Sequence, residues 1–77
     1  MKKVSLTQLK ENHRGKVIEI SGDANLQKRL MNMGVYKGRD ISKLSHIGLR
    51  GPAVIRVGRS IIALGYSVAS KVKVEQK

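Results

Sequence analysis

The sequence has no cysteine, no tryptophan and no phenylalanine, and only five of its 77 residues are acidic. The absence of cysteine excludes disulfide bonds and thiolate metal sites, and it fits a reducing cytoplasm. Apolar runs never approach the roughly 20 residues of a membrane span, and polar residues break up the N-terminal segment before a signal peptide could form. We therefore predict one cytoplasmic domain over residues 1–77, without stable membrane insertion.

Positive charge is the strongest feature that is present. Sixteen lysines and arginines against five acidic residues give a formal net charge of +11. Such a field attracts nucleic acid, anionic lipid or an acidic protein surface. The basic residues are spread along the chain, so a disordered basic tail is not indicated. A solvated surface without a specific ligand is the plainest alternative. The charge also suits a peripheral position at the inner membrane face, reached through a partner.

Short apolar segments between glycines predict a mainly β protein. The expected strands span residues 16–20, 39–46, 53–57, 60–64 and 71–75, the expected helix spans 24–33, and short turns cover 5–10 and 65–70. Ile41 and Leu44 are three apart, which breaks the strand period and predicts a bulge. Gly58-Arg59 predicts a type II′ hairpin turn. Strands this short need closure, so we predict a five-stranded SH3-like barrel with one helical insertion between its first two strands.

The expected helix has a start signal, a stop signal and one apolar stripe. Asp23 can accept hydrogen bonds from free backbone N–H groups at its start, and Gly34 can take the left-handed conformation that ends it. Leu26, Leu30 and Met33 fall at i, i+4 and i+7, so we expect all three to face the core.

The order of several motifs resembles the FeoA family. Leu6 and Leu9 precede Gly15 and Val17, Arg29-Leu30-Met31-Asn32-Met33-Gly34 is followed by Gly38, and the chain closes with Ala63-Leu64, Ala69 and Val72-Lys73-Val74-Glu75. The resemblance covers about residues 5–75. Two turns depart from the pattern. Gly48-Leu49-Arg50-Gly51-Pro52 stands where the family commonly has Pro-Leu-Gly-Asp-Pro, and Gly65 replaces an arginine after Ala-Leu.

The resemblance implies a small cytosolic SH3-like protein that supports Fe(II) uptake by binding FeoB, a membrane transporter with a GTP-binding domain. Related domains also stand at the C-terminus of some metal-dependent repressors. A basic nucleic-acid-binding domain or an accessory domain of a transcription regulator is therefore the alternative. Self-association is left open.

Catalytic, cofactor and metal sites are not indicated. The acidic residues are scattered, and no Gly-rich phosphate loop of the G-x-x-x-x-G-K-[ST] kind occurs. His13 and His46 are the only histidines and do not form a short-spaced ligand pair. A chain this cationic also repels a divalent cation. We predict a protein that is not an enzyme and has neither a cofactor nor an iron site of its own.

Two segments are candidates for partner binding. The predicted partner-binding residues are Met31, Tyr36, Lys37 and Arg39 after the helix stripe, and Ile47, Leu49 and Arg50 in the Gly/Pro loop. Met31 lies off the apolar stripe and is expected to be exposed, and methionine adapts to irregular surfaces. Tyr36 beside Lys37 and Arg39 is also the best nucleic-acid patch. Because single-strand binding relies on several stacking aromatics, nucleic acid is the less favoured partner.

Overall fold

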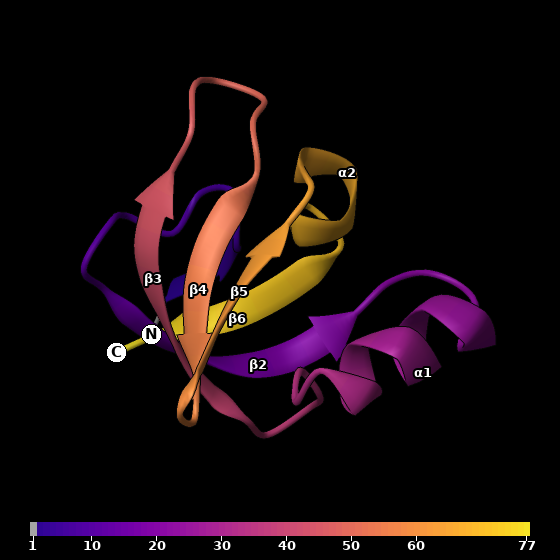
Figure 1. Cartoon of the computed structure of the whole chain (residues 1–77). Coiled ribbons are helices and arrows are strands. Elements are labelled where there is room, and N and C mark those ends of the chain that lie inside the picture. The colour runs from indigo at the N-terminus through magenta and orange to yellow at the C-terminus, as the bar shows by residue number, and fades with distance from the viewer. Residues whose placement is uncertain (1) are drawn as a thin grey trace.

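The computed structural model describes residues 2–77 as one antiparallel sheet with two helices (Figure 1). The strands are β1 (Lys2–Ser5), β2 (Arg14–Ile20), β3 (Asp40–His46), β4 (Ala53–Val57), β5 (Ser60–Leu64) and β6 (Val72–Gln76), and the helices are α1 (Ala24–Asn32) and α2 (Tyr66–Ala69). The strand order in the sheet is β1-β6-β2-β3-β4-β5. The prediction of a mainly β chain is confirmed.

The predicted five-stranded closed barrel is wrong in two respects. The sheet has six strands, because Lys2–Ser5 forms an additional strand that pairs with β6. This strand is four residues long and begins with two lysines, so its sequence carries almost no apolar alternation. The sheet is also open, with β1 and β5 as its two edges and no pairing between them over residues 2–77. Consequently α1 follows the second strand of the chain, not the first.

The two helices and the turn between β1 and β2 cover the parts of the core that the open sheet leaves uncovered. Leu30 of α1 and Ala69 of α2 are fully buried in the same apolar cluster as the inward side chains of the strands. The turn between β1 and β2 adds Leu6 and Leu9, which are also buried. The alternation predicted for the last strand is confirmed, since Val72 and Val74 are both inaccessible to solvent. The core is thus completed by side chains from elements outside the sheet.

The start and stop signals of α1 are those that the sequence predicts, although the helix ends one residue earlier, at Asn32. Leu26 N donates to Asp23 Oδ1 over 2.9 Å, and Gly34 has φ +90° just beyond the helix. The predicted burial of Met33 is wrong, because its side chain is 38% exposed. Met33 is the C-cap residue of the helix and lines a surface groove together with Leu26 and Leu30. Only Leu30 of that stripe is fully buried.

Two bulges and one tight turn shape the sheet. The predicted bulge in β3 is confirmed, between Lys43 and Ser45. The β4–β5 turn has a positive φ at Gly58, of +60°, as the first position of a type II′ turn requires. A second shift interrupts the pairing of β2 with β6 between Val17 and Glu19. It leaves the intervening Ile18 half-buried at the surface beside α1.

Candidate functional site

A groove separates α1 from the bulged part of β2 and has a volume of about 320 Å³. Its lining consists of Ile18, Glu19, Ile20, Gln27, Met31, Val35, Tyr36 and Lys37; we call it the α1–β2 groove. Val35 is fully buried at its floor, whereas Met31 is 60% exposed. The predicted exposure of Met31 is therefore confirmed. The Gln27 amide donates to Ile20 O at the end of β2 over 3.4 Å and to Gly22 O, two residues beyond it, over 3.3 Å.

Tyr36 is held in place at one end of this groove. Arg39 Nη1 donates to Tyr36 Oη over 2.9 Å, and the guanidinium carbon lies 5.6 Å from the ring centroid. The backbone of the same turn is fixed to β2, since Gly38 N donates to Val17 O over 2.7 Å and Val17 N donates to Arg39 O over 2.8 Å. Tyr36 itself is exposed. The ring is thus displayed to solvent in an ordered orientation.

The second predicted segment lies at the other end of the molecule. Ile47, Leu49 and Arg50 belong to the loop that joins β3 to β4, which extends beyond the sheet on the side opposite to the α1–β3 connection (Figure 1). We call residues 47–52 the β3–β4 loop. The structure therefore brings Met31, Tyr36, Lys37 and Arg39 together and separates them from the loop residues. That either set binds a partner stays a prediction.

The sequence analysis did not predict that Lys43 is buried. Lys43 of β3 is 1% exposed, and its Nζ donates to Leu6 O over 2.5 Å and to Leu9 O over 3.0 Å. The neighbouring backbone is tied as well, because Asn12 N donates to Lys43 O over 2.7 Å. The strand period contains the signal, since Lys43 is two residues after Ile41 and points to the same face. Lys43 thereby fastens the β1–β2 turn to the core.

The surroundings of Lys43 act on its protonation in opposite directions. Burial lowers the pKa of the Lys43 ammonium below its ordinary value of 10.5, because desolvation penalises the charged form. The Glu11 carboxylate raises the same pKa in part. Glu11 also accepts a hydrogen bond from His46 N over 3.1 Å. The net effect is a lysine that gives up its proton more readily than a solvated one.

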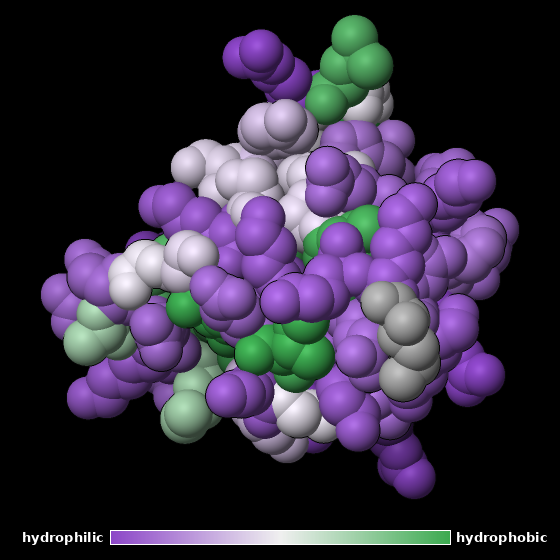
Figure 2. All heavy atoms as spheres, turned by 180° about the vertical axis from the view of Figure 1, so that it is seen from behind, coloured by the Kyte–Doolittle hydropathy of each residue, from purple (hydrophilic) through white to green (hydrophobic). Residues whose placement is uncertain are grey.

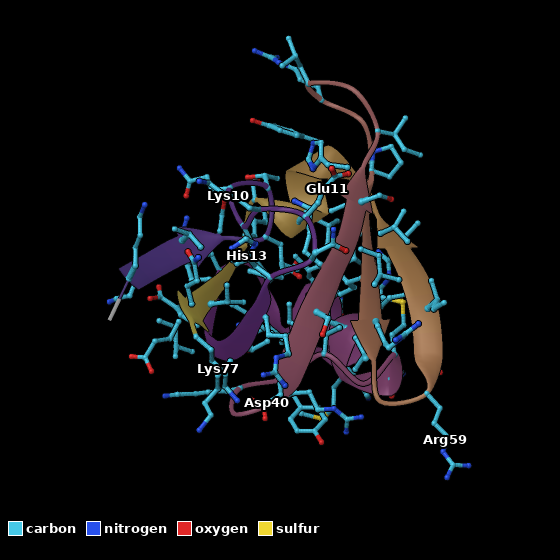
Figure 3. The ribbon with its side chains drawn as sticks, turned by 90° about the vertical axis from the view of Figure 1, so that its left-hand side faces the viewer. Lys10, Glu11, His13, Asp40, Arg59 and Lys77 are labelled. Carbon is cyan, nitrogen blue, oxygen red and sulfur yellow. The ribbon has the colours of Figure 1, made fainter. Side chains whose placement is uncertain are left out.

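At the start of β3, the Asp40 carboxylate forms an ion pair with Lys77 Nζ at 2.9 Å (Figure 3). The hydrogen bond from Lys77 is the main reason why the pKa of Asp40 lies below 3.8, and the charges of Lys77, Lys16 and Arg14 add to it. Desolvation acts in the other direction and is the second-largest influence on this pKa. Both partners of this ion pair are exposed to solvent, so it fixes the C-terminus only locally.

The histidines lie on different elements. His13 is exposed in the turn before β2, and His46 ends β3. Over residues 2–77, no group of three or more histidine and acidic side chains could hold a metal ion. That the protein has no iron site stays a prediction. In the same residues, neither helix is long and apolar enough to cross a membrane.

Comparisons with solved structures show which proteins share this geometry. An iron uptake regulatory protein (FeoA) superposes with a TM-score of 0.89 at 30% identity, and each chain is covered completely. A FeoA-like protein from Clostridium acetobutylicum gives 0.83 at 24% identity, over 99% of this chain and 88% of that one. A manganese-dependent transcriptional repressor gives 0.87 at 17% identity, and this chain spans 42% of its length. At that identity, the likeness concerns the fold alone.

A search of curated proteins found no match. The family model described as the FeoA domain matches residues 4–76, which is nearly the whole chain. This match includes both the α1–β2 groove and the β3–β4 loop. Together with the full-length likeness to the iron uptake regulatory protein, it shows that the chain belongs to the FeoA family.

Proposed function

We propose that this protein is a non-enzymatic adaptor that supports Fe(II) uptake by binding the cytoplasmic part of a FeoB-type transporter through the α1–β2 groove. Membership of the FeoA family supports the iron-uptake context. The observation that carries the proposal is the groove itself, which combines an exposed methionine, an ordered tyrosine and a lysine at one place.

The chemistry of the groove fits a protein surface. Exposed apolar patches on a small soluble domain mark interaction sites, and methionine adapts its shape to a partner. Tyrosine and arginine are the residue types that contribute most to binding energy at interfaces. The Arg39 hydrogen bond already orders Tyr36, so less conformational entropy is lost when a partner covers the ring.

Charge narrows the choice of partner surface. Lys37 lines the groove and Arg39 lies beside it, while Glu19 is the one acidic residue of the lining. On a chain with a net charge of +11, this favours an acidic partner surface with an apolar residue at its centre. A cytoplasmic location on the inner side of the membrane is part of the same proposal.

Nucleic acid remains the competing partner class. The likeness to the manganese-dependent repressor concerns the fold and does not favour it. Tyr36 is the only aromatic side chain in the groove lining, whereas sequence-tolerant binding of single strands uses several stacked bases. We expect binding of oligonucleotides to be weak and to fall steeply with salt concentration.

The test measures binding of the purified chain to full-length FeoB from the same organism in nanodiscs, at about 0.15 M salt. Met31→Asp should weaken binding at least about tenfold, because it places a charge in an apolar contact. Ile61→Asp is the matched control, since Ile61 is 58% exposed, close to the 60% of Met31, and lies on β5. Lys37→Glu should also weaken binding, and Arg59→Glu carries the same charge change as its control.

Three outcomes would contradict the proposal. The first is no binding of FeoB to the parent chain, and the second is an equal loss of affinity in Met31→Asp and Ile61→Asp. The third is tighter binding of a single-stranded oligonucleotide than of FeoB at this salt concentration. The first two remove the groove as the contact surface. The third transfers the function to the nucleic-acid class.

A further inference from the structure

We propose that the β3–β4 loop is a membrane-surface anchor whose tip, residues 47–50, seats in the interfacial layer of a bilayer that contains anionic lipids. This goes beyond the proposed function, because it assigns the loop a direct contact with lipid. FeoB binding through the α1–β2 groove does not require that contact, so the two proposals can fail separately.

The β3–β4 loop is closed by a backbone hydrogen bond, and its tip is exposed to solvent. Ile47 N donates to Pro52 O over 3.1 Å, which closes the neck of the loop. Gly51 lies so close to the Ile47 carbonyl that no side chain would fit there, and Gly48 has φ +67°. The two glycines therefore allow a conformation that holds Leu49 and Arg50 away from the body of the protein. The apolar tip protrudes beside hydrophilic atoms in the space-filling view (Figure 2).

Apolar side chains gather at this end of the molecule. Leu49 is 94% exposed, the highest value among the large exposed apolar residues, and the neighbouring Ile47 is 60% exposed. Helix α2 lies at the same end in two views and contributes Tyr66, which is also exposed (Figures 1 and 3). Single exposed apolar residues are ordinary. A leucine, an isoleucine and a tyrosine at one end match the side chains that enter membrane interfaces.

The charge around the tip suits anionic headgroups. From Ile41 to Val74 the chain contains no Asp or Glu, and Arg50 stands directly beside Leu49. Lys10 points outward at the same end (Figure 3). The acidic residue of this end, Glu11, accepts a hydrogen bond from His46 N. Basic side chains near an anionic leaflet are attracted to it, and this attraction adds to the burial of apolar side chains.

Shape favours a lipid surface over a folded partner. The tip is convex, and neither the α1–β2 groove nor the smaller groove between α1 and β5 includes a loop residue. A bilayer can deform around a narrow apolar tip, whereas a protein partner would need a cavity matched to it. With two aliphatic side chains at the tip, we expect shallow and reversible binding.

The test measures partitioning of the purified chain onto vesicles of phosphatidylcholine with about 30% phosphatidylglycerol, at about 0.1 M salt. Leu49→Asp should lower the partition coefficient at least about tenfold, because it removes the largest apolar contact. Ile61→Asp makes the same type of change away from the loop and should leave the coefficient within about twofold. Arg50→Glu should weaken binding more than Arg59→Glu, because Arg59 points outward at the end of the molecule opposite the loop (Figure 3).

Fluorescence gives an independent measurement, because the chain has no tryptophan of its own. Leu49→Trp introduces a single tryptophan at the tip, and its emission should shift to shorter wavelength when anionic vesicles are added. Ile61→Trp should show no shift. Vesicles of pure phosphatidylcholine should produce a weaker effect, and inorganic phosphate should neither produce the shift nor release the bound protein.

Several results would overturn the anchor. These are no binding of the parent chain to anionic vesicles, an equal loss of binding in Arg50→Glu and Arg59→Glu, and an unchanged Leu49→Trp emission in the bound state. Release by inorganic phosphate would replace insertion with a simple anion site. Loss of FeoB binding in Leu49→Asp, with vesicle binding intact, would make the loop a protein contact.

Discussion

Replacement of the buried Lys43 by methionine tests the most unusual feature of the core. Methionine retains most of the aliphatic volume of lysine but cannot donate a hydrogen bond. Lys43→Met therefore leaves Leu6 O and Leu9 O without the donor that each has in the parent protein. Both carbonyls belong to the turn that brings Leu6 and Leu9 into the core, so the change also loosens that apolar contact.

The expected loss follows from two opposing effects. Each buried carbonyl left without a partner costs about 1–3 kcal/mol. Removal of a desolvated ammonium offsets part of this cost. We expect Lys43→Met to lower the free energy of unfolding by about 2–4 kcal/mol. A domain of this length has roughly 4–12 kcal/mol in total, so the melting temperature should fall by roughly 10–25 °C.

The lowered pKa of Lys43 gives this prediction a dependence on pH. In the window between that lowered pKa and 10.5, the unfolded chain binds a proton at Lys43 that the folded chain has released. Stability rises with pH wherever the unfolded state binds more protons. The parent protein should therefore gain stability relative to Lys43→Met as pH increases up to 10.5. The neutral amine still has two hydrogens, enough for both carbonyls.

Urea denaturation followed by circular dichroism measures both effects, at pH values from neutral to 10.5. Lys3→Met is the matched control, because Lys3 is an exposed lysine on edge strand β1. We expect this control to change stability by less than about 0.5 kcal/mol. Equal effects of the two substitutions, or a difference between parent and Lys43→Met that shrinks as pH rises, would refute the reasoning.

Three further predictions concern the helix cap, the terminal ion pair and iron. Asp23→Ala should lower the free energy of unfolding by about 1 kcal/mol in urea denaturation, because Leu26 N loses its acceptor; an unchanged value would show that the cap is dispensable. Lys77→Ala should raise the pKa of Asp40 toward 3.8 in an NMR titration, since the Lys77 hydrogen bond is the main cause of its lowering. In the parent, the Asp40 contribution to stability is present above 3.8 and is lost as pH falls through the lowered pKa. Anaerobic calorimetric titration with Fe(II) should show no saturable binding, and micromolar affinity at unit stoichiometry would contradict the predicted absence of an iron site.

Local signals in the sequence were sufficient for much of the fold. Asp23 and Gly34 mark the ends of α1 through backbone chemistry within one helical turn, and the structure has both. The β4–β5 hairpin and the alternation of β6 depend on neighbouring residues as well. The resemblance to the FeoA pattern identified the family, and the family comparison shows the same membership. The exposure of Met31 also followed from helical spacing alone.

Other features were decided only by the tertiary structure, because they join residues that are distant in the chain. Lys43 and Leu6 are 37 positions apart, so their hydrogen bond has no counterpart in local sequence. Strand β1 exists because β6 pairs with it, although its own residues carry little strand signal. The bulge that leaves Ile18 beside α1, and so forms the α1–β2 groove, arises from pairing with β6. The separation of the seven predicted partner-binding residues into two ends has the same origin: sequence order places them within one stretch, and the path of β3 carries them apart.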